Sequence, residues 1–451
     1  MKKCPPTEER PGAGLDDLPQ DKEGLVKVQA RDRRIQKFLA RHGKSPGYRW
    51  DDLTDPRARR GRRWKLTELV SALFTGMLTG CPTLRAVEAM TEEMGPQGRQ
   101  DVPRRVPDTT LWALMPRLNV EELRAKNRQQ VRAAWRSKSL QPAGLPCGVV
   151  AIDGKGLGAL EHDADGTAQK AHRAHDGTPY WLSRMLRGVL TSAEARPCLD
   201  QLPIGAKTNE MGEFGRFFDG LMEAYGGGDL FEVVTVDAGM TSKANADRVH
   251  AAGKAYVMAL KDTQPELLRE AHRVLAGRQD PDAETDWEVH QGKRIKRRLF
   301  RTDEMAGYHE WAHLRQVWRV EQDTRDADGK LVECEQRYFL TSLHRGRLSG
   351  AQILAVVRGH WGIENDCFWT LDTQWLEDAV PWCSRGHAVE VLSWFRLMAY
   401  NLLQLARRTH LRLRRPDGSF EPPPPWRRIF EWVRQSLRLP LIDQEPEPVC
   451  G

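Results

Sequence analysis

The sequence lacks any long apolar run. No eighteen consecutive apolar residues occur, although a membrane-spanning helix needs about that many. The first residues, MKKCPPTEERPGAG, are also not followed by the apolar stretch that a secretory signal requires. We therefore expect a protein that is neither secreted nor held in a membrane.

Paired cysteines are also missing. The chain has eight cysteines, but they are scattered and none forms a CxxC pair. This pattern indicates neither a zinc site nor a disulfide framework. A reducing compartment suits such a chain, so we predict a cytoplasmic location.

Neither charge sign dominates strongly. Lys and Arg total 69 and Asp and Glu total 62, which leaves a formal charge of +7. This mild cationic bias favours a polyanionic partner such as DNA or RNA but does not require one. The length of 451 residues exceeds the usual size of a single core, so we expect two or three domains.

The pattern along the chain divides it into four parts. Residues 1–45 are rich in Pro, Gly and charge, which predicts a flexible arm. Residues 46–140 carry apolar side chains at helical spacings, including a helix expected over 108–135. A catalytic domain is expected over 144–410, and a Pro-rich tail over 411–451.

The domain expected over 144–410 alternates in a recognisable order. Its elements read strand, strand, strand, helix, strand, helix, strand, which is the order of an RNase H-like mixed sheet. Basic and aromatic strand-like runs over about 262–335, with a hairpin turn at Asp326–Lys330, predict a β-rich insertion. The fold class is therefore α/β, an RNase H-like mixed sheet with an insertion, preceded by a helical domain.

Two aspartates stand at the ends of the most apolar strands. Asp153 follows CGVVAI and Asp237 follows FEVVTV. Helical crossovers favour parallel neighbours, so both aspartates would meet at one edge of the sheet. Taken singly, each is more often an ordinary turn residue.

A third carboxylate lies in the helix that Ser349 is expected to open. Steps of three and four residues define one continuous face, and Glu364 is its only charged member. The face comprises Leu354, Val357, Trp361, Glu364, Phe368, Leu371 and Trp375. A carboxylate buried there costs several kcal/mol unless it is paired, protonated or bound to a cation. An arginine or His360 is an alternative partner.

Together these residues predict a metal-binding triad of Asp153, Asp237 and Glu364. Clustered carboxylates without a basic neighbour require a divalent cation. Two Mg²⁺ ions held there would suit phosphoryl transfer. Asp372, Glu377 and Asp378 are alternative third ligands, ranked below Glu364 because they lie off the apolar face or beyond its end.

Several motifs resemble the bacterial DDE insertion-sequence transposases that include the H-repeat-associated proteins. The resemblance spans roughly residues 50 to 405 and includes the N-terminal associated domain of that family, through LTDPRARRG at Leu53–Gly61. The other matching stretches are VVAIDGK at Val149–Lys155, KTNEM at Lys207–Met211, VVTVDAG at Val233–Gly239, ALKDTQPEL at Ala259–Leu267 and RGHWGIENDCFWTLDTQWLED at Arg358–Asp378. The chain departs from the family in the loop after Lys155 and at Phe368-Trp369.

The resemblance implies a function. It makes Asp153, Asp237 and Glu364 both the catalytic residues and the ligands of Mg²⁺, for which Mn²⁺ would substitute. The implied reaction cuts insertion-sequence ends and joins the freed 3′-hydroxyl to target DNA. The implied partners are terminal inverted repeats and target DNA, bound by a homodimer in the bacterial cytoplasm and associated with the nucleoid when on DNA.

Basic residues supply candidate DNA contacts. Lys155, Lys207 and Lys261 match family positions, while Arg358 lies in the most specific motif and Arg57 in the Arg-rich LTDPRARRGRRWK. Each has a plainer interpretation as a counter-ion or a solvated charge. The tryptophans of the Glu364 segment could stack on flipped bases, although helical spacing favours core packing for most of them.

Two other functions remain open. One is a catalytically silent or host-adopted protein that still binds DNA through the helical domain. The other is a structure-selective nuclease of the same fold. The altered loop after Lys155 is where catalysis would have been lost.

Overall fold

The computed structural model describes most of the chain. The described ranges are 34–42, 45–160, 170–173, 177–290, 292–379, 382–383, 385–415 and 417–438. Most of the arm predicted over 1–45 therefore lies outside the described residues, although 34–42 are helical. The altered loop after Lys155 also lies partly outside them. Within these ranges, no helix has the length and apolar character needed to cross a bilayer.

A group of helices precedes the sheet, as predicted. The main ones are α2 (Leu66–Leu78), α3 (Leu84–Glu92), α4 (Asp108–Leu114) and α5 (Val120–Arg136). The single helix expected over 108–135 is broken at Pro116, because proline has no backbone N–H to donate. Asn119 then caps α5 by accepting a hydrogen bond from the Glu121 amide at 3.0 Å.

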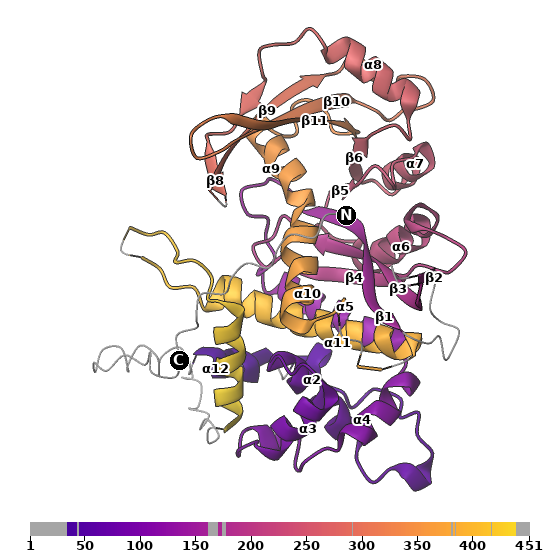
Figure 1. Cartoon of the computed structure of the whole chain (residues 1–451), viewed down its shortest axis with the longest axis vertical. Helices are drawn as coiled ribbons and strands as arrows, with labels where there is room; N and C mark the ends of the chain where they lie inside the picture. The colour runs from indigo at the N-terminus through magenta and orange to yellow at the C-terminus, as the bar shows by residue number, and fades with distance from the viewer. Residues whose placement is uncertain are drawn as a thin grey trace, which may run out of the picture.

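The core of the sheet has the predicted RNase H-like arrangement. Its strands are β1 (Val149–Leu160), β3 (Pro179–Leu190), β4 (Cys198–Pro203), β5 (Val233–Val236) and β6 (Ala255–Leu260), in the spatial order β4-β3-β1-β5-β6. The first three pair antiparallel, and β1, β5 and β6 run parallel. The helical connections are α6 (Glu210–Tyr225) and α7 (Lys243–Ala251), drawn beside the sheet in Figure 1. The fold class is therefore confirmed.

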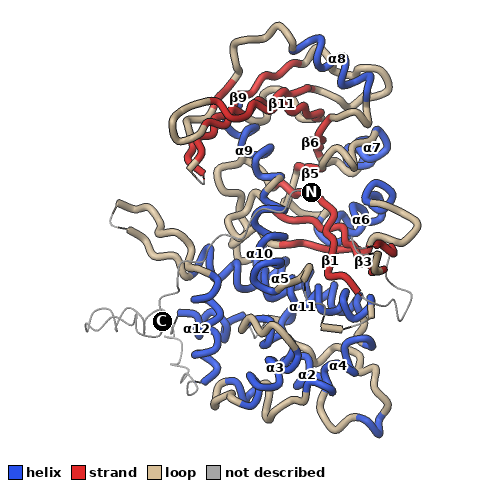
Figure 2. The backbone as a smooth tube through the Cα atoms, viewed as in Figure 1, coloured by secondary structure: helices blue, strands red, loops and turns tan. Residues whose placement is uncertain are grey.

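The β-rich insertion extends this sheet. Strand β11 (Leu331–Thr341) pairs antiparallel with β6, and β10 (Gln316–Arg325) and β9 (Lys293–Thr302) continue outward from it. The small strands β7 (Ala283–Glu284) and β8 (Glu288–His290) pair with β9, β2 (Lys170–Arg173) pairs with β3, and α8 (Pro265–Leu275) follows β6. The hairpin turn predicted at Asp326–Lys330 is confirmed. Figure 2 shows β9 and β11 of the insertion at one end of the molecule and α2–α4 at the other.

Both faces of the sheet are covered. Successive strand residues point to opposite sides, so neighbouring residues pack against different helices. Val149 and Val233 pack with Ile353 and Leu354 of α9 (Gly350–His360), whereas their neighbours Val150 and Val234 belong to the larger core that includes α6. After α9 come a π-helical turn, η5 (Ile363–Phe368), then α10 (Trp369–Trp375) and α11 (Gly386–Leu405).

The C-terminal helices join the helical region to the sheet. Helix α11 contacts α2 and α5 as well as β1 and β3. The stretch predicted as a tail contains α12 (Trp426–Arg438), whose Phe430 ring lies so close to Gly80 that an added Cβ would stand 2.8 Å from it. The Trp426 ring lies 5.2 Å from that of Trp375. The helical and sheet regions therefore share one continuous core.

Candidate active site

Strand register places Asp153 and Asp237 side by side. The last residue pair between the parallel strands β1 and β5 is Ile152 with Val236; Asp153 is the next residue of β1, and Asp237 directly follows β5. Both side chains are half-buried. The two aspartates therefore meet where the parallel β1–β5 pairing ends, as expected, but Asp153 does not end its strand, because β1 continues beside β3 to Leu160.

Each aspartate is held by its own backbone. Asp153 Oδ1 accepts a hydrogen bond from the Gly154 amide at 2.8 Å, and Asp237 Oδ1 accepts one from the Met240 amide at 3.2 Å. The Thr241 hydroxyl contacts the carbonyls of Asp237 and Ala259, tying the turn after β5 to β6. Asp237 is thus a turn residue and also a neighbour of Asp153.

The placement of Glu364 differs from the prediction. Ser349 does open a helix, with a reciprocal hydrogen-bonding pair to Gln352, but that helix ends at His360 and Glu364 lies in η5. A π-turn bonds residues five apart and so shifts the phase of the helix. Ile363, Cys367 and Phe368 point into the core, and Glu364 is exposed. The expectation of a buried Glu364 is wrong.

The alternative partners proposed for Glu364 are also absent. His360 is buried, and its Nδ1 hydrogen-bonds to the Thr235 hydroxyl at 2.9 Å. Burial lowers the pKa of His360 to about 4, although the charge of Asp237 opposes the shift, so the ring is neutral at pH 7. In the described part of the chain no basic side chain forms an ion pair with Glu364, Asp153 or Asp237.

The three carboxylates influence one another electrostatically. The pKa of Asp153 is raised to about 8, first by burial and then by the negative charges of Glu364, Asp237 and Glu210, while the Gly154 amide works against the shift. Burial is the largest cause of this shift, and the neighbouring negative charges add to it. The charges of Glu364, Asp237 and Glu210 therefore all act on Asp153.

Glu210, which sequence reasoning overlooked, is a fourth carboxylate at this point. It opens α6 and is half-buried, and a Cβ added at Gly154 would overlap its carboxyl group. Burial and the charge of Asp237 raise its pKa, while Arg184 opposes them. A signal was present, because Glu210, Phe214, Phe217 and Leu221 recur at helical spacing on one face.

The four carboxylates are the type of ligand that a hard divalent cation prefers. All four groups are carboxylates, which Mg²⁺ and Mn²⁺ favour, and the missing side chain of Gly154 makes room for one of them. As the side chains lie, no three carboxylate, imidazole or thiolate groups among the described residues stand close enough together to hold a metal ion. Metal binding would therefore require side-chain rotation, for which the exposed Glu364 has freedom.

The lower-ranked carboxylates are mostly engaged elsewhere. Glu377 is buried and forms two 2.8 Å hydrogen bonds with the buried guanidinium of Arg187. Asp372 forms an ion pair with Lys155. Asp378 is exposed. Glu377 and Asp372 thus already have cationic partners.

The structure distributes the five candidate DNA contacts over several elements. Lys207 and Lys261 are exposed, Lys155 pairs with Asp372, and Arg358 pairs with Glu288 at 2.6 Å. Arg57 is nearly buried and bonds to Asp55 and the Trp64 carbonyl, which favours the structural role for this arginine.

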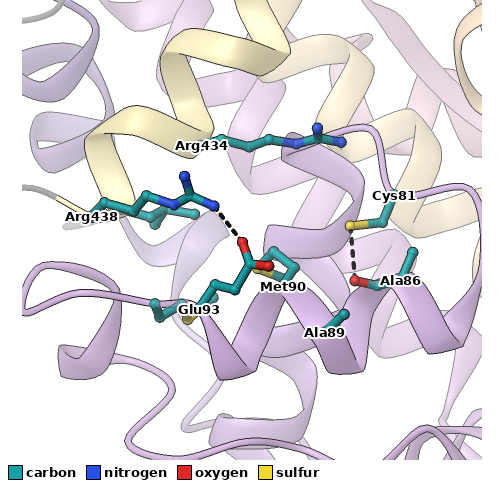
Figure 3. Close-up of a pocket in the computed structure, with 9 residues that line it drawn as sticks. Cys81, Ala86, Ala89, Met90, Glu93, Arg434 and Arg438 are labelled. Carbon is teal, nitrogen blue, oxygen red and sulfur yellow. Dashed lines mark hydrogen bonds and ion pairs between the residues drawn. The ribbon is translucent and has the colours of Figure 1, made fainter.

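Two surface cavities lie apart from the carboxylates. One of about 700 Å³ is lined by Arg62, Arg63, Lys65 and Arg104, whose guanidinium stands 3.9 Å from the centre of the Trp64 ring. The other, of about 230 Å³, lies between α3 and α12, where Arg438 pairs with Glu93 (Figure 3). Asp55 and Glu68 also line the first cavity, so its four basic residues leave a net positive lining that suits a polyanion.

Two known proteins with related sequences are transposases by name. Residues 147–402 match the family model described as "Transposase DDE domain". "H repeat-associated putative transposase YhhI" of Escherichia coli (strain K12) is 26% identical over 271 residues, 56% of this chain and 64% of that protein. "Putative transposase YncI" of Escherichia coli O157:H7 is 26% identical over 185 residues, 38% of this chain and 45% of that protein. The matches thus span less than two thirds of either relative.

A solved structure shows a more distant likeness. It is the synaptic complex of piggyBac transposase with hairpin DNA, at 12% identity and a TM-score of 0.41, covering 91% of this chain and 77% of that chain. So weak a likeness carries no argument, and the fold rests on the strand order and register described above.

Proposed function

We propose, from the premise that this chain belongs to the transposase DDE domain family, that it is a DNA transposase with Asp153, Asp237 and Glu364 at its reaction centre. The observation that carries the proposal is the strand register that places Asp153 beside Asp237. The raised pKa of Asp153 supports the proposal, because the charge of Glu364 contributes to that rise.

The proposed cofactor is a pair of Mg²⁺ ions, for which Mn²⁺ would substitute. Asp153, Asp237 and Glu364 would hold them, and Glu210 would add negative charge beside them. Ions bound there would activate the attacking oxygen and stabilise the leaving oxygen. The protein then needs no nucleophilic side chain of its own.

The remaining residues position these carboxylates. The neutral His360 ties α9 to β5 through Thr235, which lies on the same strand just before Asp237. Arg187 lies opposite Asp153 in the β1–β3 register, but its charge is directed to Glu377. Asp153 is thereby left without a basic partner in the described chain and remains free to bind a cation.

The proposed substrates are the terminal inverted repeats of an insertion sequence and target DNA. Cleavage at the ends of the insertion sequence would free a 3′-hydroxyl, which then joins target DNA. Support comes from the exposed Lys207 and Lys261 and from the basic cavity containing Arg62 and Arg104, since cationic side chains supply most of the affinity for DNA phosphates. Bringing two ends together would require a homodimer.

Two single substitutions test the proposal. Asp153→Asn and Glu364→Gln should each abolish Mg²⁺-dependent nicking and strand transfer on DNA carrying the flanking inverted repeats. DNA binding should persist, because neither substitution removes a basic side chain that could contact DNA phosphates. Glu333→Gln, which alters an exposed residue of β11, is the matched control and should react normally. Strand transfer at the normal rate by either site variant would refute the assignment.

The same assay separates the alternative functions. A catalytically silent DNA-binding protein is favoured by one observation, namely that no three described ligand groups stand in a metal-holding arrangement. Wild-type protein that binds the ends but neither nicks nor joins them would establish that function. Nicking of structured DNA without strand transfer would instead indicate a nuclease.

A further inference from the structure

The three tryptophans near Glu364 have different environments in the structure. Trp375 is buried, and its indole N–H donates to the Met77 carbonyl at 2.9 Å. Trp361 is half-buried beneath the guanidinium of Arg337, which lies 4.2 Å from its ring centre. Trp369 is 57% exposed. Core packing therefore accounts for Trp375 and largely for Trp361, but not for Trp369.

The π-turn brings Trp369 next to Glu364. The Trp369 amide donates to the Glu364 carbonyl, the five-residue bond of a π-helix. In a regular α-helix of about 3.6 residues per turn, residues five apart point roughly 140° away from each other. The wider π-turn instead places them about one turn apart on the same side, and both side chains are exposed.

A cation stands on the other side of Trp369. Asp372 follows Trp369 by three residues, a spacing that makes them neighbours on a helix surface, and Asp372 holds the ammonium of Lys155. Along this helical segment Trp369 therefore stands between Glu364 and Asp372, the residue that pairs with Lys155.

We propose that Trp369 is a stacking platform for an unpaired nucleotide base next to the phosphate that reacts. This inference rests on the proposed function. One π-turn, closed by the hydrogen bond from the Trp369 amide to the Glu364 carbonyl, separates the indole from the proposed metal ligand. A base flanking a phosphate held at the carboxylates thus comes within reach of the indole, and any base offers a flat face for stacking.

The test compares two DNA probes made from the sequence that flanks the gene. One is a blunt duplex that ends at the terminal repeat, and the other is the same duplex with a short single-stranded overhang containing 2-aminopurine. Trp369→Ala should bind the overhang duplex roughly 5- to 150-fold more weakly than wild type and bind the blunt duplex almost normally. Trp369→Tyr should restore most of the affinity, because tyrosine retains an aromatic face.

The fluorescence of 2-aminopurine is a readout that a merely structural role would not change. Wild type and Trp369→Tyr should quench it through stacking, and Trp369→Ala should not. Phe420→Ala is the matched control, since Phe420 is a similarly exposed ring, 51% accessible, in the C-terminal hairpin. It should behave as wild type on both probes.

The outcomes distinguish this inference from the proposed function. Equal affinity of wild type and Trp369→Ala for the overhang duplex, or an equal loss on both probes, would overturn the role of Trp369 and leave the transposase proposal standing. Failure of the wild-type protein to bind either duplex would overturn both.

Discussion

Replacing Glu377 with glutamine should destabilise the protein strongly without acting on metal binding. Glu377 and Arg187 are both buried, with no exposed side-chain surface, and two 2.8 Å hydrogen bonds join them. The introduced amide would keep the shape of the side chain but leave the guanidinium without its counter-charge. Removing one partner of a buried pair costs about 3–5 kcal/mol, which corresponds to a fall in melting temperature of roughly 3–5 °C for a chain of 451 residues, at about 2.1 cal/mol/K of unfolding entropy per residue.

The assay is thermal unfolding followed by circular dichroism, with and without Mn²⁺. Glu431→Gln is the matched control, because it removes an exposed pair with Arg427 that is worth about 1 kcal/mol or less. The double variant Arg187→Met/Glu377→Leu should be less destabilised than Glu377→Gln, since replacing a buried pair with apolar groups avoids the uncompensated charge.

The pH dependence gives a second check on the same pair. Burial tends to raise the pKa of Glu377, but Arg187 more than offsets this and the net pKa is lowered from 4.5. A lowered native pKa stabilises the fold above the unfolded pKa, and that contribution is lost as pH falls through the native value. Glu377→Gln should lack this acid-dependent component. A variant that melts like wild type but loses stabilisation by Mn²⁺ would refute the reasoning and make Glu377 a metal ligand.

Two further predictions concern the carboxylate cluster. Because the pKa of Asp153 is raised from 3.8 to about 8, the folded protein holds a proton that the unfolded chain releases. In EDTA this contribution to stability should therefore decline as pH rises from about 4 to 8. Asp153→Asn should consequently melt at a higher temperature than wild type at pH 8. An unchanged or lower melting temperature would contradict the burial and negative charge assigned to Asp153. Glu210→Gln should weaken Mn²⁺ binding roughly 10-fold or more, as measured by isothermal titration calorimetry. The control Glu213→Gln should not, because Glu213 pairs with Arg216. Equal affinities of wild type and Glu210→Gln would show that Glu210 contributes nothing to the cation site.

Sequence reasoning succeeded where a pattern is local. The β-branched runs before Asp153 and Asp237 predicted two buried strands, and the order of strands and helices predicted their parallel pairing, which the register confirms. Ser349 was correctly expected to open the helix leading towards Glu364. These features depend on periodicity and capping, which neighbouring residues specify by themselves.

Reasoning from helical spacing failed at Glu364 and would have succeeded at Glu210. The face calculated for Glu364 assumed an uninterrupted α-helix, but η5 inserts a π-turn and rotates Glu364 outward. The same spacing rule applied to α6 places Glu210 above Phe214 and Phe217, and there the carboxylate is half-buried beside Gly154.

By itself the sequence determined the order of the strands and the parallel pairing that sets Asp153 beside Asp237, because strand formation and parallel crossovers follow from local pattern and chain connectivity. Only the tertiary structure decided which charges compensate one another. Lys155 and Asp372 are 217 residues apart, and Arg187 and Glu377 are 190 residues apart. The choice between a counter-ion and a ligand depends on which groups share a desolvated space, and that is settled when the sheet, η5 and α11 pack together.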